Sequence, residues 1–398
     1  MKKLLLSSST FTILVMGINF LFKIYLSYKV TKEELGLFWT FLDLISIGIM
    51  FFSGFKDSLI VSHDRDDFRQ ILYWYIITFW SLFVLVLIGD LEYFDTLDFP
   101  YPIYYFMTLL FFNAVMIFVS YLNASYKNYK IMLFENLVMS IALVGSFFLL
   151  YDFFPFEKTL FISFCISYIV RTLYIIYLGK IEWNITKVSI VHAQDFFKNT
   201  FLSGGMYFFS GFFISMSGII LLNLFHDKTV LAEYQVVVRS IFFSLVAVFV
   251  FPLNTFTFPH LSKFIAEGNI DEIFRIEKKL VKYLFIFFIF LLFGTFLTKF
   301  IITLVFPKEY QESYIMLNIL LPFLPFIAYT TFALNIIKGF NRFDLALYVR
   351  VLGTILFFIS ISIFYTLKMD AKSVVYSLDI SFITMFLMAL YFRRKVLL

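Results

Sequence analysis

Long uninterrupted apolar runs dominate this chain of 398 residues. Each run approaches or exceeds the roughly 20 residues that a helix needs to cross the hydrocarbon core of a bilayer. They are also longer than the about 9–11 residues of a barrel strand and lack a two-residue period, so helices must satisfy the backbone hydrogen bonds. There are twelve, near residues 8–28, 36–61, 71–89, 102–122, 131–151, 159–178, 200–224, 231–257, 281–304, 313–336, 345–366 and 371–392.

The composition excludes a soluble protein. Apolar residues make up 61% of the chain and charged residues only 15%, whereas a soluble domain has about 25% charged residues. After twelve spans, roughly ten residues remain for each connection, so no soluble catalytic or nucleotide-binding domain fits. The sequence therefore predicts an all-α integral membrane protein with about twelve transmembrane helices.

The distribution of lysine and arginine predicts the orientation. Loops on the side of the two termini hold 19 basic residues, the opposite loops hold 8, and 5 lie inside spans. Because basic loops stay in the cytoplasm, we expect both termini there. Cys165 is the only cysteine, which gives no basis for a disulfide framework or a metal cluster. No phosphate-binding GxxxxGK[ST] loop occurs, so we expect no ATP hydrolysis and no cofactor.

Two halves of the chain resemble each other. Segment 31–38 is echoed by segment 227–234 at an offset of 196, and the asparagines and lysine after the fourth span are echoed after the tenth. Six spans separate the copies, so the repeats have the same orientation, as in transporters with a substrate path between the repeats. Chance similarity between apolar strings is the alternative. The repeat predicts two six-helix lobes, residues 1–199 and 200–398.

Four stretches resemble motifs of the polysaccharide flippases in the multidrug/oligosaccharidyl-lipid/polysaccharide exporter superfamily. One departure is Pro307, where that family often has glycine. The matching stretches are KEELGLF at 32–38, YQVVVR at 234–239 with FPL and PHLS after it, FPKEY at 306–310, and KGFNR at 338–342.

The resemblance implies a V-shaped pair of six-helix lobes and alternating access in a bacterial inner membrane. It implies an oligosaccharide on a polyprenyl diphosphate as substrate, moved from the cytoplasmic to the outer leaflet for cell-surface polysaccharide synthesis. Spans one, two, seven and eight would face the central cavity. We expect a monomer that contacts membrane lipids and polysaccharide-assembly proteins and binds no nucleic acid.

Three ionisable residues inside the spans are the first candidates for substrate binding. Lys23 lies in span one, Asp43 in span two and Arg239 in span eight. Such residues cost about 2.5–3.5 kcal/mol on insertion scales and usually face protein or a wet cavity. Asp43 and Arg239 are equivalent at the repeat offset of 196, which suggests a charged ring in the outer half of the cavity. The alternatives are structural ion pairs and, for Lys23, snorkelling.

Further candidates follow from helical periodicity and position. Asn19 shares a polar face with Lys23, and Gln235 shares a face with Arg239 that continues towards Asn254. Close helix packing is the alternative explanation for such faces. Lys56 and Asp57 lie near the cytoplasmic end of span two, where either side chain could contact the diphosphate. Asp379 in span twelve is a candidate carrier of a proton or Na⁺. The alternative for Asp379 is a structural hydrogen bond.

The intramembrane charges favour an anionic substrate, because cations outnumber anions five to three. The cations are Lys23, Lys56, Arg171, Arg239 and Arg350, and the anions are Asp43, Asp57 and Asp379. We expect Arg171 and Arg350 to bind lipid head groups or to snorkel. Arginine and lysine suit a diphosphate, whereas a site for cationic drugs would need carboxylates and aromatic faces. A drug exporter of the same superfamily is the alternative within the class. A membrane glycosyl polymerase or acyltransferase is a further alternative, although the loops offer no large outward segment, and the outward His226 and Asp227 have no visible partner. We expect a transporter and not an enzyme.

Overall fold

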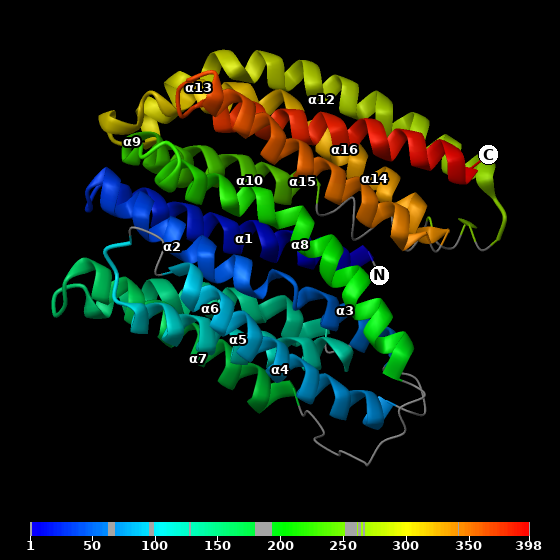
Figure 1. Ribbon diagram of the computed structural model, residues 1–398, viewed down its shortest axis with the longest axis horizontal. Coiled ribbons are helices and arrows are strands. Elements are labelled where there is room, and N and C mark those ends of the chain that lie inside the picture. The colour runs from blue at the N-terminus through cyan, green and yellow to red at the C-terminus, as the bar shows by residue number, and fades with distance from the viewer. Residues whose placement is uncertain are drawn as a thin grey trace. The chain divides into compact units, whose positions relative to one another are not determined.

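The computed structural model describes an all-helical chain, and no strand occurs among the residues that it describes (Figure 1). The described ranges are 2–62, 68–94, 99–126, 129–179, 193–250, 261, 264–265, 267–340 and 342–397.

Helices follow one another throughout the described ranges. Those of the first half are α1 (Lys2–Ser27), α2 (Lys32–Met50), α3 (Ser53–Ser62), α4 (Phe68–Phe94), α5 (Ile103–Ser125), α6 (Tyr129–Leu150) and α7 (Phe156–Gly179). Those of the second half are α8 (Ala193–Asn223), α9 (Lys228–Ala232), a π-helical segment (Glu233–Val238), α10 (Arg239–Phe249), α12 (Ile270–Val305), α13 (Ser313–Leu320), α14 (Leu324–Gly339), α15 (Phe343–Thr366) and α16 (Ser373–Leu397). Short 3₁₀ turns at Lys308–Tyr310 and Leu321–Phe323 flank α13.

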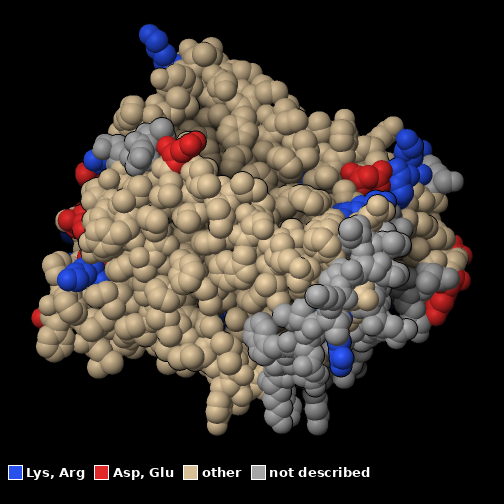
Figure 2. Space-filling model, turned by 60° about the horizontal axis from the view of Figure 1, so that its bottom comes forward, with Lys and Arg blue, Asp and Glu red and all other residues tan. Residues whose placement is uncertain are grey.

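Ten described helical stretches are long and apolar enough to cross a membrane. The other two predicted spans correspond to α2 and α6. Helix α2 carries four charged residues within its 19 residues, and the apolar described part of α6 is short. On the face shown in Figure 2, charged side chains form small groups near the edges and leave a broad uncharged surface between them. The chain is an all-α, multi-pass membrane protein.

The second predicted span, residues 36–61, is not one continuous helix. It is divided at Phe51 and Phe52 into α2 and α3. Around the break, Phe52 N donates to Ile49 O at 3.1 Å, a three-residue bond that tightens the last turn. Gly54 then packs against α8, where a Cβ atom would lie 2.1 Å from Thr200 O. This close approach of two backbones requires glycine at the first turn of α3.

The described residues form two compact units. Unit 1 comprises Met1–Thr12, Lys23–Thr40 and Phe212–Leu398, and unit 2 comprises Ile13–Phe22 and Phe41–Gly211. Within unit 1, α15 and α16 pack along each other, and within unit 2, α6 packs along α7 (Figure 1). These units do not test the predicted lobes, residues 1–199 and 200–398, which stay a prediction.

Local structure at the starts of α2 and α9 supports the repeat. Thr31 Oγ1 accepts a hydrogen bond from Glu34 N at 3.4 Å, and Asp227 Oδ1 accepts one from Val230 N at 2.9 Å. Thr31 and Asp227 are 196 residues apart, and both satisfy a free N–H at a helix start. Each of these helices therefore begins in the same way at equivalent positions.

The two equivalent helices also contact each other in unit 1. Gly36 lies against Ala232, again at the offset of 196, and a Cβ atom on Gly36 would be 2.7 Å from the Ala232 Cα atom. A contact between equivalent positions is what a two-fold relationship between repeats produces on its axis. The packing of α2 on α9 thus brings one pair of equivalent positions into contact, while the two-fold relationship between the repeats stays a prediction.

Candidate functional site

A hydrogen-bonded cluster in unit 1 brings together two of the cations predicted inside the spans. Lys23 comes from α1, and Arg239 is the first residue of α10. Neutral polar side chains from α2, α8, the π-helical segment and α10 connect them. We call this group the Lys23–Arg239 cluster; it consists of Lys23, Thr40, Ser215, Gln235, Arg239 and Ser240.

Lys23 contacts both a hydroxyl group and an aromatic ring. Its Nζ atom donates to Ser240 Oγ at 2.9 Å and lies 4.0 Å from the centroid of the Trp39 ring. Its side chain is half-buried. An ammonium over an indole face is stabilised by about 0.5–2 kcal/mol, more as water is excluded. Lys23 is therefore fixed within unit 1 by specific contacts, beyond simple snorkelling.

Gln235 and Arg239 form the other side of the cluster. Gln235 is fully buried; its Nε2 donates to Thr40 Oγ1 at 3.1 Å, and its Oε1 accepts from Arg239 Nη1 at 3.0 Å. Arg239 Nη2 also donates to Ser215 Oγ at 3.4 Å, and the guanidinium lies 5.7 Å from the Phe243 ring centroid. The amide thus orients the guanidinium through one bond while a second bond anchors Gln235 on α2.

A stretch of π-helix produces this arrangement. The segment Glu233–Val238 lies between α9 and α10, and all its side chains are buried. π-Helical turns are rare and occur frequently at functional sites, because the extra residue in the turn shifts the following side chains. Here Ser240 Oγ donates to Gln235 O at 3.4 Å, five residues back. Ser240, five residues on, is thereby placed beside Gln235, while Arg239 shares the helix face of Gln235.

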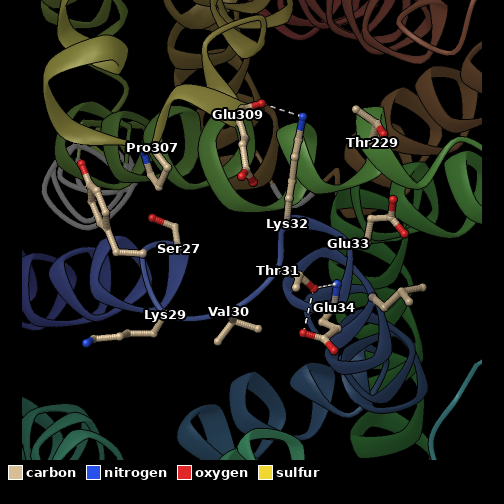
Figure 3. A pocket seen from close by; sticks show the side chains of 12 residues that line it. Ser27, Lys29, Val30, Thr31, Lys32, Glu33, Glu34, Thr229, Pro307 and Glu309 are labelled. Carbon is tan, nitrogen blue, oxygen red and sulfur yellow. Dashed lines mark hydrogen bonds between the residues drawn. The ribbon is translucent and has the colours of Figure 1, made fainter.

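An ion pair lies at the start of the same helical stretch. Lys32 Nζ is 2.7 Å from Glu233 Oε1, and the side chains are 11% and 4% exposed. The same ammonium group donates to Glu309 O at 2.8 Å (Figure 3). It also lies 5.5 Å from the centroid of the Tyr310 ring. Burial, followed by the charges of Glu309 and Glu233, raises the pKa of Tyr310 above its ordinary value, so this phenol stays neutral beside Lys32.

A polar cavity of about 870 Å³ opens next to this ion pair. The loop between α1 and α2 forms most of its wall, with Thr229, Pro307 and Glu309 opposite (Figure 3). Lys32 lines the cavity and points across it to the backbone of Glu309. Lys32 thus lines the cavity, and its partner Glu233 begins the π-helical segment that leads to Gln235 and Arg239 of the Lys23–Arg239 cluster.

Asn19, Asp43 and Lys56 belong to unit 2, where Asp43 is buried and the other two are half-buried. The Asp57 side chain and the whole of Asn254 lie outside the described residues.

Asp379 belongs to unit 1 but is not among the residues of the Lys23–Arg239 cluster. It is buried in α16, and its Oδ1 atom has no hydrogen-bond partner among the residues that the structure describes. The structure thus joins Lys23, Gln235 and Arg239 in one cluster and leaves Asp379 outside it.

Two ion pairs were not anticipated from the sequence. One is that of Lys32 with Glu233, whose lysine was assigned to a loop. The other, in unit 2, joins Arg171 Nη2 to Glu135 Oε1 at 2.9 Å, with Ser120 Oγ donating to the same oxygen at 3.1 Å. Glu135 lies in an apolar run, and an acidic residue within a span is the sequence feature that could have indicated this pair. Arg171 is therefore held by a carboxylate, whereas snorkelling or a lipid head group was expected.

No family model and no curated protein sequence matches this chain. Solved structures of transporters do match its fold over nearly the full length. A MOP superfamily transporter from Pyrococcus furiosus, for which a binding pocket of reverse polarity is described, has a TM-score of 0.69 at 14% identity, covering 99% of this chain and 96% of its own.

Transporters with different cargoes share this fold. The outward-facing structure of a multidrug resistance MATE family transporter matches with a TM-score of 0.68 and 15% identity, over 100% of this chain and 96% of its own. The lipid II flippase MurJ, in an inward closed conformation, matches with a TM-score of 0.72 and 15% identity, over 98% and 88%. The chain thus has the fold of MOP superfamily transporters.

Proposed function

We propose that this protein is a transporter of the MOP superfamily that flips a polyprenyl-diphosphate-linked oligosaccharide across a bacterial inner membrane by alternating access. The observation that carries the proposal is the Lys23–Arg239 cluster. It holds an ammonium and a guanidinium group on adjacent positions of one hydrogen-bonded network within the membrane-spanning region.

The chemistry of this cluster suits a diphosphate. A guanidinium offers paired N–H donors that match two phosphate oxygens, and an ammonium supplies a compact point charge. Hydroxyl and amide groups of Ser240, Ser215 and Gln235 already bond the two cations. These hydrogen bonds orient the two cations, and a preformed pair of cations favours an anionic substrate.

The other candidate residues take subordinate roles in the proposal. Asn19, Asp43, Lys56, Asp57 and Asn254 would contact the sugars or the diphosphate at other stages of transport. Asp379 would carry the coupling proton or Na⁺. A drug exporter of the same fold remains the competing function, since a multidrug MATE transporter is among the matching structures.

The decisive experiment is removal of the gene from a glycan-producing host. We expect surface polysaccharide to disappear and lipid-linked oligosaccharide to accumulate on the cytoplasmic leaflet, where externally added glycosidase cannot reach it in intact cells. Complementation with the intact gene should restore both. Normal surface glycan together with increased sensitivity to cationic dyes would instead assign the protein to drug export.

A further inference from the structure

Helix α12 carries a row of basic side chains on one face near its start. Arg275, Lys278, Lys279 and Lys282 follow the spacing i, i+3, i+4, i+7, which places them along one side of a helix. All four are exposed. The loop after the predicted eighth span, about residues 260–279, mixes apolar residues with lysine and glutamate, a pattern that predicts a separate surface amphipathic helix. The structure instead makes the four basic residues part of one helix with the next span, Ile270–Val305.

The opposite side of the same turns is packed against the protein. Ile273 forms a buried apolar group with Leu261, Phe332 and Ile336. Glu277 accepts hydrogen bonds from Tyr329 of α14 and Arg393 of α16. These contacts fix the rotation of α12, so the row of basic residues is held facing away from the helices that pack against it.

The end of α16 adds two more cations at this end of α12. The bond between Arg393 and Glu277 joins the last turns of α16 to the first turns of α12, as Figure 1 shows for these two helices. Arg394 and Lys395, which follow directly, are exposed. We call the combined surface the basic face; it consists of Arg275, Lys278, Lys279, Lys282, Arg394 and Lys395.

Most of this charge is not neutralised by the protein. Arg275 pairs with Glu272 at 3.2 Å. The other five cations of the basic face form no ion pair among the residues that the structure describes. Five positive charges within a short surface create a local field that needs anions from outside the chain.

The position of the basic face relative to the bilayer follows from the sequence of α12. Between Lys282 and Lys299 lie sixteen residues without a charge, which span about 24 Å of helix. The hydrocarbon core is about 30 Å thick, and lysine side chains extend outward from its edges. Phe290 and Phe296 in this stretch are 69% and 82% exposed, as expected of lipid-facing side chains. Lys282 therefore lies at the interface, and the rest of the basic face lies at head-group level.

We propose that the basic face binds the anionic head groups of phospholipids in the leaflet at which α12 begins. Each lysine or arginine near an anionic membrane surface contributes about 1 kcal/mol, which corresponds to roughly fivefold in affinity. The bound lipids would hold the joined ends of α12 and α16 at a fixed depth. This proposal needs only a membrane-spanning chain and is independent of the transported substrate.

Native mass spectrometry of the full-length detergent-solubilised protein tests the proposal. Phosphatidylglycerol and phosphatidylcholine with identical acyl chains are added at equal concentration, and retained lipids are counted. We expect a preference of at least about fivefold for phosphatidylglycerol. Solution binding of the same lipids at 1 M salt should lose this preference, because the screening length falls to about 3 Å. Equal retention of the two lipids would overturn the proposal.

Variants locate the effect on the basic face. The triple variant K278Q/K279Q/K282Q should reduce the preference to less than about twofold, while the charge-retaining K278R/K279R/K282R should keep it. A matched control, K228Q/K308Q/K368Q, removes three exposed lysines at the opposite ends of the helices and should keep it as well. An unchanged preference in the glutamine variant, or a loss in the control, would contradict the assignment.

A final arm separates membrane lipid from soluble phosphate. Inorganic diphosphate is titrated at constant ionic strength against bound phosphatidylglycerol. We expect no displacement beyond that caused by sodium sulfate at the same ionic strength. Saturable displacement by diphosphate alone would show that the basic face is a soluble-phosphate site and that the proposal is wrong.

Discussion

The ammonium group of Lys32 lies 2.7 Å from Glu233 Oε1 and joins the first turn of α2 to the first residue of the π-helical segment. These two elements belong to the two copies of the repeat. We expect an ion pair between them to stabilise a closed state of this end of the repeat. In a transporter that works by alternating access, such a pair must break whenever this end opens.

We therefore predict that K32Q and E233Q each increase opening at this end. Hydrogen bonds to charged groups contribute about 1.5–3 kcal/mol, so we expect roughly a tenfold to hundredfold rise in the open population. A cysteine placed at Val236, which is fully buried, should react with maleimide correspondingly faster in a C165S background.

Two variants control this experiment. R275Q removes an exposed pair with Glu272 and should leave the labelling rate unchanged, since surface pairs contribute about 0–1 kcal/mol. The exchanged pair K32E/E233K should restore slow labelling. If the cysteine at position 236 reacts faster in R275Q, or no faster in K32Q, than in the protein with both ion pairs intact, the Lys32–Glu233 pair does not hold this end closed.

The contact of Gly36 with Ala232 gives a second prediction. A methyl group on Gly36 would lie 2.7 Å from the Ala232 Cα atom, which is backbone and cannot rotate away. We expect G36A to lower the free energy of unfolding by about 1–3 kcal/mol, as overpacking does. The control G145A adds a methyl group to a helical glycine with nothing within 4 Å and should be neutral or stabilising by up to about 1 kcal/mol. Thermal unfolding of the purified protein measures both.

Much of the fold was predictable because the bilayer imposes helix length. Ten of the twelve predicted spans are confirmed by length and composition. The break between α2 and α3 was not predicted, and the close approach of Gly54 to Thr200 beside it joins residues far apart in the sequence. The start of α12 was predicted as a separate helix for a similar reason, since its apolar residues pack on Phe332 of α14.

The site was partly predictable from the cost of charge in a membrane. That cost singled out Lys23 and Arg239, and the structure brings them into one cluster. Their partner Ser240 and the ion pair of Lys32 with Glu233 depend on the packing of α1 and α2 against the second repeat, which a single sequence does not contain. Whether these residues bind substrate stays a prediction.

The ion pair of Arg171 with Glu135 predicts a large loss of stability when one partner is removed. The two side chains are only 13% and 8% exposed, and Ser120 completes the network. We expect E135Q to destabilise unit 2 by about 3–5 kcal/mol, because it leaves a buried guanidinium without a counter-charge. The double variant E135L/R171M should recover most of that loss. A thermal unfolding temperature of E135Q equal to that of the wild type would show that the pair contributes nothing to stability.

Asp379 gives a prediction about energy coupling. It is buried in α16, and asparagine has nearly the same size but carries neither a proton nor a counter-charge for Na⁺. In proteoliposomes with an imposed proton or Na⁺ gradient, we expect D379N to fold normally and to lose gradient-driven transport while exchange at equilibrium persists. Equal acceleration by the gradient in D379N and in the wild type would leave Asp379 a structural group.

The last prediction concerns Arg239, which donates hydrogen bonds to Gln235 and Ser215. If its guanidinium binds the diphosphate, R239A should reduce glycan export at least tenfold at unchanged protein level, since a charged hydrogen bond contributes about 1.5–3 kcal/mol. R239K keeps the charge but loses the paired geometry, so an intermediate rate is expected. R342A is the matched control, because Arg342 is exposed and pairs with Asp344 at 2.9 Å outside the cluster. Export in R239A equal to that of R342A would return Arg239 to a purely structural role, with Gln235 and Ser215 as its partners.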